Sequence, residues 1–150
     1  GIRPNQFEEK IMAARRSRTY RLRLSDEGTA RFIDCHHRLG RLTGSLIPYG
    51  ATLFVAMLLT QGADPAEIAA EISLAAARRS RSDREHFVGA SDELSSIEAA
   101  VGELVEPSDL LSGRPSQAAI FIAGIAIMAS SEDKAIIAAF DRMTRLVARV

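Results

Sequence analysis

The sequence predicts a mainly α-helical fold that carries one short, two-stranded antiparallel ribbon. Three observations support this prediction. Within residues 18–24, apolar and polar side chains alternate strictly from Thr19 onward, several later segments repeat apolar residues at helical spacing, and short motifs recur in the same order in both halves of the chain. A chain of 150 residues is long enough to bury a sizeable core, so the fold requires no metal or disulfide.

The first strand is predicted at residues 18–24, where alternation separates an inner apolar face from an outer polar face. The inner face holds Tyr20, Leu22 and Leu24, and the outer face holds Thr19, Arg21 and Arg23. Guanidinium groups fit guanine edges and phosphates well, so two exposed arginines on one strand favour a ribbon that lies in a DNA major groove. The three outer residues are therefore the candidate base-contacting residues.

Two helices are predicted after this strand. Ser25 is the expected cap of a helix that runs to about Leu39, with Gly40 as its stop. The turn at residues 43–45 then opens a second helix over residues 46–61, whose middle is apolar on every side. Such a helix must be surrounded by protein.

The second half of the chain begins with a connecting helix. Asp64, Pro65 and Glu67 form a strong start signal for a helix that ends near Arg79, and residues 78–84 are the expected linker. A second strand is predicted at residues 86–90, with Val88 and Ala90 inward and with Phe87 and Gly89 outward. It carries no arginine. Residues 105–116 are the expected loop, and Ser131 is the expected cap of a last helix.

The order of strand, amphipathic helix, small-residue turn and buried helix resembles the ribbon-helix-helix family of DNA-binding proteins over residues 18–61. In that family two units interlock, their strands pair antiparallel in the major groove, and the second helix begins at a DNA phosphate. The resemblance implies base contacts by Thr19, Arg21 and Arg23. It also implies phosphate contacts by Thr43, Gly44 and Ser45.

Four ordered echoes indicate that the unit is duplicated within the chain. Ala-Ala-Arg-Arg-Ser-Arg occurs at residues 13–18 and 76–81, Ser-Asp-Glu at 25–27 and 91–93, and two looser matches relate 42–44 to 111–113 and 53–56 to 120–123. The expected organisation is a basic arm (1–16), a first unit (17–62), a connecting helix and linker (63–83), a degenerate second unit (84–129) and a C-terminal helix (130–150). A homodimer remains an alternative to this single-chain pair.

The charge distribution supports a DNA-binding face although the net charge is zero. Residues 1–42 hold ten Lys or Arg against five Asp or Glu, whereas residues 43–150 hold nine against fourteen. One basic face would meet the phosphate backbone while the remainder is repelled from it. Lys10, Arg15, Arg16 and Arg18 lead into the alternating residues of the first strand, and we expect these basic residues to contact flanking phosphates.

Signals for catalysis, metals or membranes are weak. Residues 34–37 collect Asp, Cys, His and His, but neighbours on a helix point about 100° apart and cannot converge on one ion. No Gly-rich phosphate loop or nucleophile elbow is present. We therefore expect no catalytic residue, metal or cofactor. The single cysteine, Cys35, and the absence of a long apolar run or signal arrangement lead us to expect a cytoplasmic protein.

Two fused units with extra helices are similar to the auxiliary DNA-binding proteins of conjugative relaxosomes, in particular to small accessory proteins of the Agrobacterium T-DNA system. That resemblance implies a non-enzymatic protein that binds specific double-stranded DNA and helps a relaxase nick its border or origin site. Two alternatives stay open. One is a ribbon-helix-helix repressor or antitoxin, and the other is an all-helical interaction module in which residues 19–24 begin a longer helix.

Overall fold

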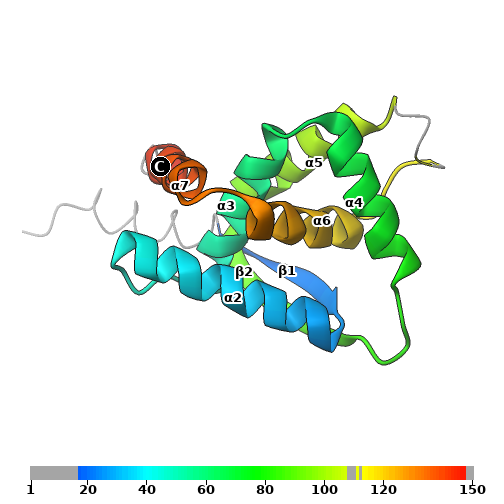
Figure 1. Cartoon of the computed structure of the whole chain (residues 1–150), viewed down its shortest axis with the longest axis horizontal. Helices are drawn as coiled ribbons and strands as arrows, with labels where there is room; N and C mark the ends of the chain where they lie inside the picture. The colour runs from blue at the N-terminus through cyan, green and yellow to red at the C-terminus, as the bar shows by residue number, and fades with distance from the viewer. Residues whose placement is uncertain (1–16, 108–110, 112, 148–150) are drawn as a thin grey trace, which may run out of the picture.

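The computed structural model describes residues 17–107, 111 and 113–147, and this part of the chain contains two strands and six helices (Figure 1). In chain order they are β1 (Ser17–Leu24), α2 (Asp26–Thr43), α3 (Tyr49–Gln61), α4 (Pro65–Ala77), β2 (Arg84–Ser91), α5 (Glu93–Val105), α6 (Gln117–Ser130) and α7 (Asp133–Val147). The predicted mainly α fold with a short antiparallel ribbon is confirmed. The alternative of a longer helix from residue 19 is wrong, because alternating burial of side chains requires a strand at this position.

The ribbon joins two strands that lie far apart in the sequence. β1 pairs antiparallel with β2, with Ser17 opposite Ser91 and Leu24 opposite Arg84. The inner face is buried and consists mainly of Tyr20, Leu22, Leu24, Val88 and Ala90. The predicted inward and outward faces of both strands are therefore confirmed. β2 is longer than predicted, because it starts at Arg84 instead of residue 86.

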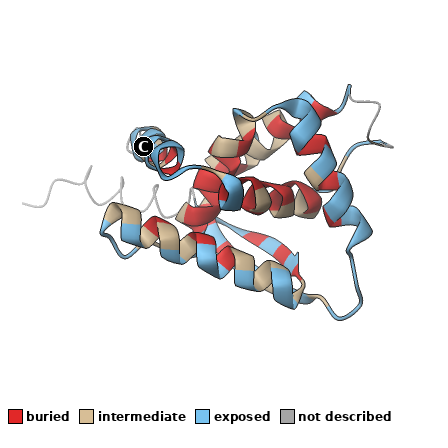
Figure 2. Ribbon diagram, viewed as in Figure 1, coloured by how far each residue is buried: buried red, intermediate tan, exposed pale blue. Residues whose placement is uncertain are grey.

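The core is built around α3 and α6, which are the most thoroughly buried helices in Figure 2. They pack against each other. In addition, α3 contacts α5, α7 and β2, whereas α6 contacts α2, α4 and β1. A helix that is apolar all round has no face to offer to water, and α3 is surrounded by protein as its sequence predicts.

The boundary between α2 and α3 differs from the prediction at both ends. Gly40 does not stop α2, which continues to Thr43 and ends at Gly44. Gly44 has a φ of 64°, and its N–H donates to the carbonyl of Gly40, as in a left-handed helix cap. The next helix begins only at Tyr49, because Pro48 disfavours a helical conformation at Ile47.

Local capping sets several of the other helix ends. The side chains of Ser25 and Asp64 accept hydrogen bonds from the N–H groups of Gly28 and Ala66, as expected for N-caps. Ser131 does not cap α7, contrary to the prediction. Its hydroxyl donates back to the carbonyl of Ile127 at 2.7 Å, so it completes the end of α6 instead.

The elements follow one order twice. A strand and three helices, β1-α2-α3-α4, are followed by a strand and three helices, β2-α5-α6-α7. Corresponding elements start at residues 17 and 84, 26 and 93, 49 and 117, and 65 and 133, so each pair lies 67 or 68 residues apart. The helix that the sequence marks as a connector, α4, therefore has the same place in the order as the C-terminal helix α7.

Candidate nucleic-acid interface

The outer face of the ribbon brings the three predicted base-contacting residues together. We call this surface the reading face; it consists of Thr19, Arg21 and Arg23 on β1 and of Glu85, Phe87 and Gly89 on β2, all of which are exposed. The register sets Thr19 opposite Gly89, Arg21 opposite Phe87 and Arg23 opposite Glu85. The β2 residues were not among the predicted site residues, although extending the alternation of β2 to residue 85 identifies them.

Arg21 lies near the middle of the reading face and forms an ion pair with Glu85. The distance from its Nε to the Glu85 carboxylate is 2.5 Å, and the two side chains are 73% and 44% exposed. Ion pairs this exposed contribute about 0–1 kcal/mol, because water and salt screen them. The ion pair therefore orients the guanidinium of Arg21 only weakly. The guanidinium is free to exchange the Glu85 carboxylate for another acceptor.

Phe87 places a large apolar side chain beside that guanidinium. It is 66% exposed, on a strand whose inner face is well packed. One half of the reading face thus presents donors from β1, and the other half presents an apolar ring, a carboxylate and a glycine from β2. The reading face is therefore chemically asymmetric, although β1 and β2 hold the same place in the repeated order of elements.

Arg18, a predicted phosphate contact, lies at the edge of the ribbon. Its guanidinium donates to the hydroxyl of Ser95 on α5 at 2.9 Å and lies 5.4 Å from the centre of the Tyr20 ring. Tyr20 is buried and donates through its hydroxyl to the carbonyl of Ser91. These contacts tie the start of β1 to α5 and hold the Arg18 side chain on the helix-facing side of the ribbon, opposite to the reading face. Lys10, Arg15 and Arg16 lie outside the described residues.

The predicted phosphate anchor does not lie at a helix start, so the structural basis of that prediction is wrong. Thr43 is the last residue of α2, and its hydroxyl donates to the carbonyl of Leu39 at 2.9 Å. Gly44 and Ser45 follow it in the turn. They line one open cleft of about 400 Å³ that also contains His37 and Arg41 from α2. The turn is therefore basic, but four residues separate Gly44 from the first residue of α3.

The true start of α3 lies against the ribbon. Gly50 is buried there, and a Cβ atom at this position would collide with the carbonyl oxygen of Gly89 on β2. Pro48 precedes the helix without a side-chain cap. The N–H of Ala51 donates to the carbonyl of Pro48 at 3.0 Å, so the donors and the partial positive charge that the start of α3 places beside the ribbon come from Tyr49 and Gly50. Gly50 also faces the Cβ of Ala90 on the inner side of the ribbon, so the start of α3 lies against the Gly89–Ala90 end of β2.

Residues 34–37, which the sequence analysis considered as metal ligands, point to different surroundings. Cys35 is buried, and this burial raises the pKa of its thiol to about 11. The Nδ1 of His36 lies 2.7 Å from the hydroxyl of Thr52, and its ring stacks on Tyr49. Burial lowers the pKa of His36. Within the described residues, no group of three or more His, Cys, Asp or Glu side chains could hold a metal ion.

Comparison with protein-family models, with curated proteins and with solved structures finds no match to this chain. In the part of the chain that the structure describes, none of the helices has the length and apolar character needed to cross a membrane. The assignment of a function therefore depends on the geometry of the ribbon and on the residues that it exposes.

Proposed function

We propose that this protein binds double-stranded DNA by laying the reading face in the major groove, as a duplicated ribbon-helix-helix unit within one chain. The observation that carries the proposal is the pairing of β1 with β2. It produces a two-stranded ribbon whose inner face is buried on helices and whose outer face exposes Thr19, Arg21 and Arg23. A two-stranded ribbon fits the width of the major groove, where base edges can be distinguished.

The repeated element order supports the duplication. A single ribbon-helix-helix unit leaves its strand without a partner and its second helix uncovered, so units of this kind normally dimerise. Here β2 supplies the partner strand and α6 packs against α3. One copy of the chain is thus expected to bind DNA as a monomer.

The phosphate contacts are proposed at two places on the first unit. The start of α3 offers backbone amides beside the ribbon, and helix starts of this kind bind phosphate readily. The cleft at the end of α2 adds Arg41 and His37 beside Gly44 and Ser45. We keep Gly44 and Ser45 in the proposed site for this reason, whereas the hydroxyl of Thr43 is engaged within α2.

For the biological role we propose an accessory DNA-binding protein of a conjugative or T-DNA relaxosome, with a relaxase as partner. This step depends on the likeness of two fused units with extra helices to such proteins. The asymmetric chemistry of the reading face supports it, because a non-palindromic origin or border site calls for an asymmetric reader.

The experiment is a selection of bound fragments from random duplex DNA, followed by affinity measurements on the selected site and on unrelated DNA. Arg21→Ala and Arg23→Ala should each reduce discrimination between the two DNAs by about 1–3 kcal/mol for one lost bidentate contact. Equal losses on both DNAs would refute base reading. Absence of salt-dependent binding by the wild-type chain would refute DNA binding altogether.

A second measurement tests the proposed role. Addition of the purified protein should increase nicking of supercoiled DNA by a relaxase only when the DNA carries the selected site. A protein that binds the site and leaves nicking unchanged would instead fit the repressor or antitoxin alternative.

A further inference from the structure

The turn that connects α4 to β2 is rich in arginine. Residues 78–84 hold four arginines and one aspartate, and the arginines are Arg78, Arg79, Arg81 and Arg84. All four are exposed. We call this segment the basic turn.

Hydrogen bonds give the basic turn a defined shape. Asp83 accepts from the N–H of Ser80 at 3.1 Å, and the N–H of Asp83 donates to the carbonyl of Ser80 at 3.2 Å. The hydroxyls of Ser80 and Ser82 lie 3.0 Å apart. The hydrogen bonds of the turn are thus made by its small polar side chains and backbone, and all four arginines stay exposed. Among the described residues, no carboxylate lies within ion-pair distance of these arginines.

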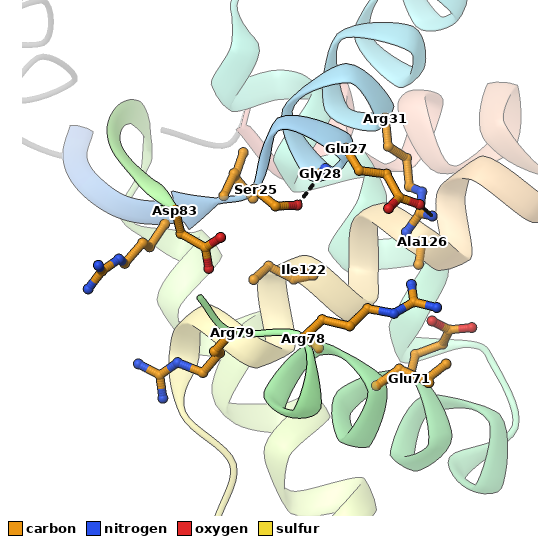
Figure 3. A pocket seen from close by; sticks show the side chains of 14 residues that line it. Ser25, Glu27, Gly28, Arg31, Glu71, Arg78, Arg79, Asp83, Ile122 and Ala126 are labelled. Carbon is orange, nitrogen blue, oxygen red and sulfur yellow. Dashed lines mark hydrogen bonds and ion pairs between the residues drawn. The ribbon is translucent and has the colours of Figure 1, made fainter. Parts of the chain in front are cut away.

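The basic turn lies at one end of the ribbon. It leads directly into Arg84, which is opposite Leu24 at the end of β1. Next to it, Arg23 of the reading face, Arg31 of α2 and Arg78 line a small hollow of about 60 Å³. Figure 3 shows Arg78 reaching toward Arg31 and Glu71, whereas Arg79 points away from the hollow. The positive charge of the reading face therefore continues past the end of the ribbon onto the turn.

The hollow itself is a poor site for a free anion, because the carboxylates of Glu27, Glu71 and Asp83 also line it. A duplex that lies across the outside of the turn meets arginines instead. Exposed guanidinium groups along a projecting segment match a row of backbone phosphates better than a single enclosed ion.

The sequence motif that leads into the basic turn also leads into β1 and ends at Arg18. The six residues at 76–81 are identical to those at 13–18, and the two strands run antiparallel. The starts of β1 and β2 therefore lie at opposite ends of the ribbon.

We propose that the basic turn is a further phosphate-contacting site, which binds the backbone of duplex DNA next to the base pairs that the reading face contacts. This inference rests on the proposed function. It assigns a direct role in DNA binding to a segment that otherwise only links two units. Arg78, Arg79 and Arg81 supply the contacts, which depend on charge and carry no base specificity.

The test compares two variants that lose the same charge. One carries Arg78→Gln, Arg79→Gln and Arg81→Gln, and the control carries Lys134→Gln, Arg142→Gln and Arg145→Gln on the exposed face of α7. Affinity for one selected duplex is measured over a series of salt concentrations. Each lost phosphate contact should reduce the slope of log K against log salt by about 0.9, so the turn variant should lose a total of about 2–3. The control should keep the wild-type slope.

Three further measurements complete the test. A variant with lysine at the three turn positions should restore the slope, because it keeps the charges. The ratio of specific to non-specific affinity should stay at the wild-type value in all variants. Excess inorganic phosphate at constant ionic strength should not reproduce the effect of the turn substitutions.

The outcomes separate the two proposals. An unchanged slope in the turn variant, or equal changes in the turn variant and the α7 control, overturns the assignment of the basic turn while DNA binding by the ribbon stands. If inorganic phosphate at constant ionic strength reproduces the effect of the turn substitutions on DNA binding, the arginines bind a free anion. That result would also overturn the assignment of the basic turn. If the wild-type chain does not bind duplex DNA, both proposals fail.

Discussion

Substitution of Gly50 by alanine tests how closely α3 approaches the ribbon. A Cβ atom at this position would overlap the carbonyl oxygen of Gly89 and would lie 2.9 Å from the Cβ of Ala90. Both obstacles belong to a paired strand, so neither can rotate away. Overpacking of a buried site costs typically about 1–3 kcal/mol, and the better helix propensity of alanine returns at most about 1 kcal/mol.

We therefore expect Gly50→Ala to lower the free energy of unfolding by about 2 kcal/mol, which corresponds to about 4–8 °C in Tm for a chain of this size. Urea titration and calorimetry measure the two quantities. Gly89→Ala is the matched control on the other side of the same contact, because no atom lies within 4 Å of a Cβ at Gly89. Equal Tm values for the two variants would show that α3 does not approach β2 as closely as described, and would weaken the proposed phosphate site at its start.

Three further predictions concern the helix α2. Gly44→Val should destabilise the protein by about 1–2 kcal/mol in urea titration, because valine is strained at a φ of 64°, and Gly44→Asn should cost less. The pKa of His36 is lowered from 6.5 by burial, so the unfolded chain binds this proton more tightly. The contribution of neutral His36 to the stability of the folded state is complete above pH 6.5 and is lost as the pH falls below that value. The free energy of unfolding, measured by urea titration at pH values from 8 to 5, should therefore fall more steeply for the wild type than for His36→Gln. Cys35, with a pKa raised to about 11 and a buried side chain, should not react with a thiol reagent at pH 8 until the protein is unfolded, and rapid labelling of the native protein would contradict its burial.

The sequence could predict the face of each strand and the capped starts of α2 and α4, but not the end of α2 or the start of α3. Alternation is a local property, so Tyr20 is buried and Arg21 is exposed as predicted. The end of α2 depends on a competition between Gly40 and Gly44, since both can stop a helix. The left-handed conformation at Gly44 ends α2, and Pro48 delays the start of α3 to Tyr49. The start of α3 therefore does not lie at the predicted anchor at residues 43–45.

The sequence by itself determined that a strand with two outward arginines precedes an amphipathic helix and a fully apolar helix, because these features follow from residue order and helical or strand period. Only the tertiary structure decided which strand pairs with β1 and in what register. Register is a long-range property, set by packing of both strands on the same core. That register places Arg21 beside Glu85 and Phe87, and it brings the basic turn to the end of the reading face, although more than fifty residues separate these segments in the chain.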